Sequence, residues 1–338
     1  MTIQEVIKQK EYDFLRTNEH LGKNLLFLTF GGSHAYGTNV PESDIDVRGV
    51  ALPTKREIIT GKGFEQVLDE PTDTTVYEFR KLISLLSNCN PNVIEMLGCR
   101  PETYIFYSEA GRELLKNKEM FLSKKAAAAF GGYATAQLRR LDNKSARVLP
   151  DEAHETHILN SIASASTTFR DKYLEMPEDA IRLYVDKAVN PEMESEIFMD
   201  VSLHHYPIRD YKCMWAEMHQ IVKDYAKIGK RNSNAIKRGK LAKHSMHLIR
   251  LFMMGIDILL EGKIVTYREK EHDFLMEIRN GMYLDDTGMP TDEFMDIVND
   301  YESRFKAAKE KSPLPDKPDY KKIDDFTYDI IEKYVLFP

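Results

Sequence analysis

The sequence contains little of what marks secreted, zinc-binding or membrane-spanning proteins. Its 338 residues include three cysteines, at positions 89, 99 and 213. Three are too few for a disulfide framework, and their spacing is too wide for a zinc site. The most apolar run, residues 248–260, carries Arg250 and Asp257 and is too short to span a bilayer. The N-terminal stretch is charged throughout and lacks the apolar core of a signal peptide. We therefore expect a reduced, cytoplasmic protein with no membrane partner.

An excess of positive charge is also missing. The chain has 47 Lys and Arg against 54 Asp and Glu, a formal net charge of −7. Any contact with nucleic acid would therefore need a local basic patch. No repeat period divides the chain, and its length suggests roughly two domains.

Patterns of apolar residues predict a mixed α/β region followed by a helical one. Short apolar or alternating runs indicate strands over residues 25–30, 44–52, 64–68 and 74–79. Helices are expected over residues 1–17, 81–88 and 92–98, and then over 123–141, 154–176, 177–189, 211–228, 241–262, 291–311 and 320–336. The predicted fold is an α+β domain over residues 1–120 and an α-helical domain over residues 121–338.

Residues 31–50, GGSHAYGTNVPESDIDVRGV, carry the clearest chemical signal. A buried strand ends at Phe30, and Gly31, Gly32 and Ser33 then open a turn. Glycine lets a phosphate approach the backbone closely, and the Ser33 hydroxyl adds a donor at the same place. These three residues are therefore candidate phosphate ligands.

Asp44 and Asp46 follow in the same segment. On a strand, positions two apart face the same side, so both carboxylates project together. Two aligned aspartates repel one another unless a cation lies between them. Carboxylate oxygens combined with substrate phosphates are the usual ligands of Mg²⁺ in proteins. A phosphate-binding turn beside such a pair indicates phosphoryl or nucleotidyl transfer, whereas either fragment alone is more often structural.

The segments GSHAYGT (residues 32–38) and SDIDVRGV (residues 43–50) resemble the signature of the polymerase-β nucleotidyltransferase superfamily. Within it they are most similar to the predicted nucleotidyltransferases associated with RNA ligases, the RlaP family. One departure is His34, where many relatives carry arginine. Weaker similarities extend the resemblance over residues 25–283: Asn90, Pro91, Asn92, Glu95, Phe121, Leu122, Ser123, Lys243, His244, Arg250, Gly262, Lys263, Ile264, Ile278, Arg279 and Gly281.

The resemblance implies a mixed sheet flanked by helices, a two-magnesium site and transfer of a nucleoside monophosphate from an NTP to a hydroxyl. The expected acceptor is an RNA or tRNA end. Asp44 and Asp46 would be the metal ligands and catalytic residues, and Gly31, Gly32 and Ser33 would hold the triphosphate. Arg48 would bind phosphate or pair with the aspartates.

Members of the superfamily usually supply a third carboxylate from a neighbouring strand. The candidates here are Asp69, Glu70, Asp73 and Glu78. We predict Glu78 because it ends the strand over residues 74–79, just before a helix. Asp73 directly follows Pro71 and Thr72 and is more typical of a turn.

Residues 223–250 hold nine basic residues and one acidic residue. At helical spacing, Lys243 and Arg250 fall on one stripe, so we expect them to contact a triphosphate or an RNA backbone; the alternative is a solvated charged face.

Three other functions stay open: nucleotidylation of a protein or small molecule, a catalytically silent RNA-binding module, and a metal hydrolase built on His154 and His157.

Overall fold

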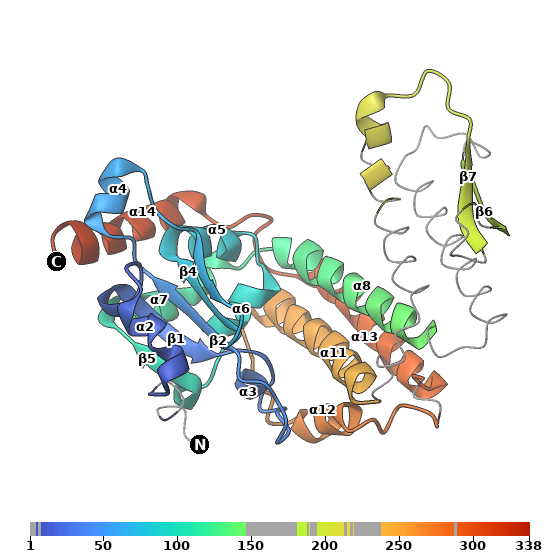
Figure 1. The fold of residues 1–338 in the computed structure, drawn as a ribbon, viewed down its shortest axis with the longest axis horizontal. Coiled ribbons are helices and arrows are strands. Elements are labelled where there is room, and N and C mark those ends of the chain that lie inside the picture. The colour runs from blue at the N-terminus through green and yellow to red at the C-terminus, as the bar shows by residue number, and fades with distance from the viewer. Residues whose placement is uncertain are drawn as a thin grey trace. The chain divides into compact units, whose positions relative to one another are not determined.

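The computed structural model describes residues 5, 8–146, 181–187, 189, 195–212, 215–216, 219, 238–286 and 289–338 (Figure 1). The chain divides into two compact units. Unit 1 comprises Met1–Leu138, Ala242–Tyr283 and Thr291–Pro338, and unit 2 comprises Arg139–Leu241 and Leu284–Pro290. The helices that follow residue 242 thus belong with the N-terminal part, and the contacts do not divide the chain at the predicted boundary between residues 120 and 121.

A mixed five-stranded sheet forms the centre of unit 1, in the order β3-β4-β2-β1-β5. The strands are β1 (Leu25–Phe30), β2 (Val47–Ala51), β3 (Gln66–Asp69), β4 (Thr74–Glu78) and β5 (Tyr104–Tyr107). β2 and β4 are parallel, and the other neighbouring pairs are antiparallel. This confirms the mixed sheet and four of its strands, although β2 begins three residues later than predicted and β5 was missed.

Both faces of the sheet are covered. One face packs on a core of buried residues from the N-terminal segment and the inner strands: Tyr12, Leu15, Leu21, Leu28, Phe30, Val47, Ala51 and Val76. On β1, α7 (Glu109–Lys116) lies so close that a Cβ on Gly111 would stand 2.5 Å from the Leu26 carbonyl oxygen. The apolar run of β1 is therefore explained by burial on both sides.

The helices of unit 1 surround this sheet and extend from it. They are α2 (Phe14–Thr17), α3 (Gly32–Tyr36), α4 (Lys55–Thr60), α5 (Phe79–Ser87), α6 (Pro91–Leu97), α7, the first part of α8 (Lys125–Ala146), most of α11 (Arg238–Glu261), α12 (His272–Arg279), α13 (Asp292–Lys311) and α14 (Tyr320–Ile331). α8, α11 and α13 pack together (Figure 1): a Cβ on Gly255 would lie 2.5 Å from the Phe305 ring and 3.2 Å from Phe130. α14 continues into a π turn over Glu332–Leu336 and packs on α5.

Unit 2 contains a two-stranded antiparallel sheet of β6 (Ile181–Lys187) and β7 (Ser195–Val201). The helix predicted over residues 177–189 is therefore wrong for residues 181–187. In IRLYVDK, apolar residues recur at every second position from Ile181 to Val185, which suits a strand better than a helix.

The helix predicted over residues 154–176 lies outside the described residues, as do His154 and His157. Within the part of the chain that the structure describes, no helix is long and apolar enough to cross a membrane.

Candidate functional site

The Asp46 side chain lies directly against the glycine turn that follows β1. The Gly31 amide donates to the Asp46 carbonyl at 2.9 Å, which joins the turn to the residue preceding β2. Gly32 has a φ of 51°, and a Cβ there would stand 1.9 Å from Asp46 Oδ2. Only glycine fits, because it tolerates this backbone and leaves room for the carboxylate. The two halves of the signature are therefore one site.

Asp73 is the second carboxylate of the cluster. The parallel pairing of β2 with β4 sets Val47 beside Thr74, so the residues that precede these two strands meet at one sheet edge. The Val47 amide donates to the Asp73 carbonyl at 3.3 Å, and the Asp46 and Asp73 side chains are hydrogen-bonded. Asp73 adopts a φ of 44°, which is uncommon outside glycine.

Arg48 holds this pair of aspartates from β2. Its guanidinium donates to the Asp73 carboxylate at 3.1 Å and to the Asp73 carbonyl, and it lies 3.6 Å from Asp46 Oδ1. The Arg48 and Asp46 side chains are about one-fifth exposed. Arg48 is thus an ion-pair partner of the aspartates, which is one of its two predicted roles.

Burial, reinforced by the hydrogen bond with Asp73, raises the pKa of Asp46 to about 7, while the charges of Arg48 and Lys243 act against this rise. For Asp73, the hydrogen bond with Asp46 is the largest cause that lowers the pKa, and Arg48 and Lys243 add to it. These opposite shifts predict that the pair shares a proton, with Asp46 as its donor to the Asp73 carboxylate. Shared protons are typical of two carboxylates brought together without a cation between them.

The Asp46 and Asp73 carboxylates fit a divalent cation. Their oxygens are typical ligands of such a cation, and its positive charge would stabilise the two negative charges. Asp44, predicted as the partner of Asp46, is exposed two residues before it. Among the described residues, no three His, Cys, Asp or Glu side chains form a ready metal-binding group. Two or three carboxylates at one edge suit Mg²⁺, which takes remaining ligands from water and substrate phosphates.

Glu78, the predicted third carboxylate, is at the other end of β4, because it pairs with Ala51 and not with the start of β2. Its side chain caps α5 by accepting from the Lys81 amide at 3.2 Å and pairs with Arg80 at 2.9 Å. Glu78 is thus a buried helix cap away from Asp46, and the structure brings Asp73 to that place instead.

The remaining predicted ligands differ in accessibility. Ser33 is in the first turn of α3 and is 9% exposed. Lys243 is exposed on α11, and its charge acts on both carboxylates. Arg250 is only 5% exposed, with its guanidinium 3.3 Å from the centre of the Tyr36 ring. It is therefore a buried stacking residue rather than an open phosphate ligand. Most of the basic stretch before residue 238 lies outside the described residues.

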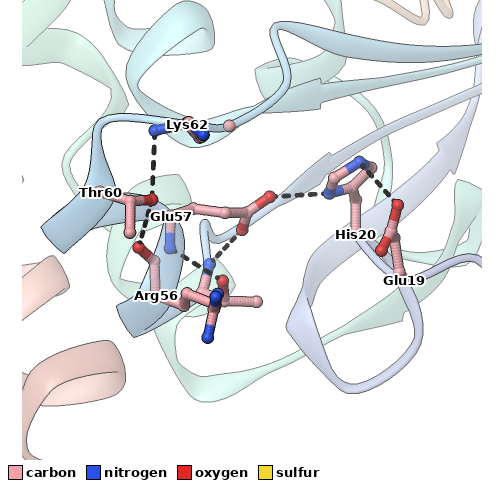
Figure 2. A pocket seen from close by; sticks show the side chains of 8 residues that line it. Glu19, His20, Arg56, Glu57, Thr60 and Lys62 are labelled. Atoms are coloured by element: carbon pink, nitrogen blue, oxygen red, sulfur yellow. Dashed lines mark hydrogen bonds and ion pairs between the residues drawn. The ribbon is translucent and has the colours of Figure 1, made fainter.

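A pocket of about 380 Å³ opens at the other end of β2, near α4 (Figure 2). Its polar groups bind one another: His20 Nδ1 lies 2.7 Å from a Glu57 oxygen, and Glu57 and Thr54 form a capping box. Thr54 follows β2, whereas Asp46 precedes it, so this pocket is not part of the aspartate site.

A family model matches the N-terminal part of the chain, which contains this site. Residues 4–152 match the model of a family described as the RNA repair pathway DNA polymerase beta family. The match includes the glycine turn, Asp44, Asp46 and Asp73. It ends at residue 152, so the resemblance proposed for the later helices is not part of it. No solved structure matches the chain significantly.

Two curated proteins are similar over short segments. An uncharacterized 38.9 kDa protein of Enterobacteria phage T4, from the nrdC-mobD intergenic region, is 27% identical over 88 residues, 23% of this chain and 26% of that protein. The uncharacterized protein YcgL of Bacillus subtilis is 30% identical over 97 residues, 27% of this chain and 37% of that protein. The chain thus spans about a quarter of the phage protein's length and somewhat more than a third of the length of YcgL. The match over residues 4–152 supports a polymerase-β-like nucleotidyltransferase family for this part of the chain, the one described as the RNA repair pathway DNA polymerase beta family.

Proposed function

We propose that the protein transfers a nucleoside monophosphate from an NTP to a hydroxyl at the end of an RNA or tRNA. The observation that carries this proposal is the contact of Asp46 with Gly32, beside Asp73 and Arg48. It sets carboxylates next to a glycine backbone, as a bound triphosphate with its cation requires.

Asp46 and Asp73 would hold magnesium, with Asp44 completing the ligands from the same edge. Bound there, magnesium would neutralise the triphosphate and favour in-line displacement at the α-phosphorus. Asp73 replaces Glu78 in our assignment of the third carboxylate.

The chain's own residues have separate tasks in this reaction. The backbone of Gly31 and Gly32, with the Ser33 hydroxyl, would bind and orient the triphosphate. Arg48 fixes the Asp73 carboxylate through the 3.1 Å hydrogen bond. Lys243, exposed on α11, would attract the polyphosphate. Transfer forms a bond between the acceptor oxygen and the α-phosphorus, breaks the bond to the β-phosphate oxygen, and releases pyrophosphate; the hydroxyl proton passes to a carboxylate or to water.

The test compares NTPs labelled at the α- or the γ-phosphate, each with magnesium and an RNA pool that includes tRNA. Nucleotidyl transfer predicts that RNA gains the α-label and never the γ-label, and that Asp73→Asn loses this transfer. Label on protein alone would favour protein nucleotidylation. NTP or RNA binding without any label would identify a silent module of the same fold.

A further inference from the structure

The helix that carries Ser33 is too short to be stable alone. α3 has five residues, no side-chain cap at Gly31, and it ends at Gly37 in a left-handed conformation with a φ of 70°. An isolated helix of this length does not persist in water. Its conformation must therefore come from tertiary contacts, and Tyr36 provides two of them.

Tyr36 is buried at 4% exposure and contacts two other helices of unit 1. Its hydroxyl donates to Glu95 Oε2 on α6 at 2.7 Å, and Arg250 of α11 stacks on its ring at 3.3 Å from the centroid. Burial raises the pKa of Glu95, and the charge of Arg250 opposes this rise. A satisfied buried polar network of this kind fixes geometry more strictly than apolar packing does.

A second set of contacts holds the end of α3. His272 Nε2 lies 2.9 Å from the Gly37 carbonyl oxygen. The Tyr267 ring packs so closely on Gly37 that a Cβ there would lie 2.3 Å from it, and Arg100 covers that ring at 3.6 Å from its centroid. The end of α3 is thus held by residues from both the N-terminal part and the later helices.

We infer that Tyr36, Glu95 and Arg250 form a clamp that positions the Gly32–Ser33 turn against Asp46 for nucleotide binding. These three are positioning residues and do not touch the nucleotide. α11 contributes twice, because Arg250 belongs to the clamp and Lys243, seven positions earlier and hence on the same helical face, lies near the aspartates. The inference rests on the proposed function only in the part of its test that measures nucleotide binding.

The test is hydrogen exchange of the amides of Ala35 and Thr38, which bond to Gly31 and Ser33 carbonyls at 3.2 and 2.9 Å. Tyr36→Phe removes the bond to Glu95 and keeps the ring under Arg250. Tyr104→Phe is the matched control, because its hydroxyl makes a similarly short bond, 2.6 Å to the Met96 carbonyl of α6, from a residue outside α3. We expect exchange of the two amides to rise about tenfold in Tyr36→Phe and to stay unchanged in Tyr104→Phe.

Two further variants and an NTP titration separate positioning from general stability. Glu95→Gln keeps an acceptor for the Tyr36 hydroxyl and should leave exchange of the two amides slow. Glu95→Ala removes the acceptor and should make their exchange faster. The dissociation constant of magnesium-NTP, measured without RNA, should rise about tenfold in Tyr36→Phe and stay unchanged in Tyr104→Phe. Equal exchange in Tyr36→Phe and Tyr104→Phe would overturn the clamp, as would faster exchange with unchanged NTP affinity. If the wild-type protein binds no NTP, the proposed function fails, and exchange still decides whether the clamp exists.

Discussion

Asp46 and Asp73 are 27 positions apart in sequence and hydrogen-bonded in the structure, because each directly precedes one of two paired parallel strands. Arg48, the second residue of β2, donates a hydrogen bond to the Asp73 carboxylate and lies 3.6 Å from Asp46 Oδ1. The register of β2 and β4 therefore brings these side chains together. Our proposed assignment of the metal-binding carboxylates follows from this register.

The first prediction separates the two candidates for the third carboxylate. Asp73→Asn should lower nucleotidyl transfer by at least about 10³-fold, because it removes a proposed metal ligand without changing its volume. Glu78→Gln, which changes the same kind of group at the other end of β4, should keep activity within about threefold and at most weaken the cap of α5. Steady-state rates of both variants decide this, and loss of activity in Glu78→Gln alone would return the role to Glu78.

The second prediction concerns the glycine turn. Gly32→Ala should abolish transfer, because its Cβ would overlap the Asp46 carboxylate. Gly61→Ala is the control: Gly61 has a similar φ of 64°, but a Cβ there meets nothing within 4 Å. The left-handed backbone should cost each variant about 1 kcal/mol of stability, and Gly32→Ala should lose more because of the overlap with Asp46. Urea unfolding measures both losses, and only Gly32→Ala should be inactive. An active Gly32→Ala would show that this contact is not needed.

The third prediction follows from the raised pKa of Asp46, about 7 in the folded protein. The unfolded chain releases this proton near pH 4. Between these values the folded protein binds more protons, so the free energy of unfolding should fall as the pH rises from about 4 to about 7 without divalent metal. The lowered pKa of Asp73 acts in the opposite sense, and only in acid, where stability falls as Asp73 becomes protonated.

Asp46→Asn should remove the fall in stability between pH 4 and 7 and be more stable than wild type at pH 8 by on the order of 1 kcal/mol. Magnesium should stabilise wild type more at pH 8 than at pH 5, because it replaces the shared proton. Chemical unfolding across this pH range, with magnesium or a chelator, measures both effects. The same slope in wild type and Asp46→Asn would contradict the shared proton.

The fourth prediction concerns Lys243. Lys243→Ala should raise the dissociation constant of NTP about tenfold, and the difference should shrink at high salt, because Lys243 is exposed and acts through charge. Lys263→Ala is the control, since Lys263 is also exposed but pairs with Glu261 at 2.9 Å. Equal effects of the two variants at all salt concentrations would exclude a specific role for Lys243.

Local sequence patterns predicted the elements with strong local signals and missed those that depend on distant pairing. β1 and β4 were found because each is a short run of apolar or β-branched residues between turns. β5 was missed because YIFY, at residues 104–107, is too short to stand out, and β6 because its alternation was taken for a helix. In both cases the partner strand, not the segment itself, decides the structure.

The site was predictable where one segment contains it, as with Gly32, Ser33 and Asp46. Asp73 was one of four candidates for the third carboxylate and was placed behind Glu78 because it looked like a turn residue, and it does adopt a turn conformation. A signal was present, since Asp73 directly precedes a strand as Asp46 does. The buried position of Arg250 under Tyr36 could not be predicted, because the amphipathic pattern of α11 does not show which neighbour covers each face.

The most direct test of the account is transfer of label from α-labelled NTP to RNA, with wild type and Asp46→Asn compared in magnesium. We predict that wild type labels RNA and releases one pyrophosphate for each nucleotide transferred, and that Asp46→Asn, although folded and at least as stable at pH 8, does neither. RNA labelling by Asp46→Asn at the wild-type rate would contradict the assignment of this site.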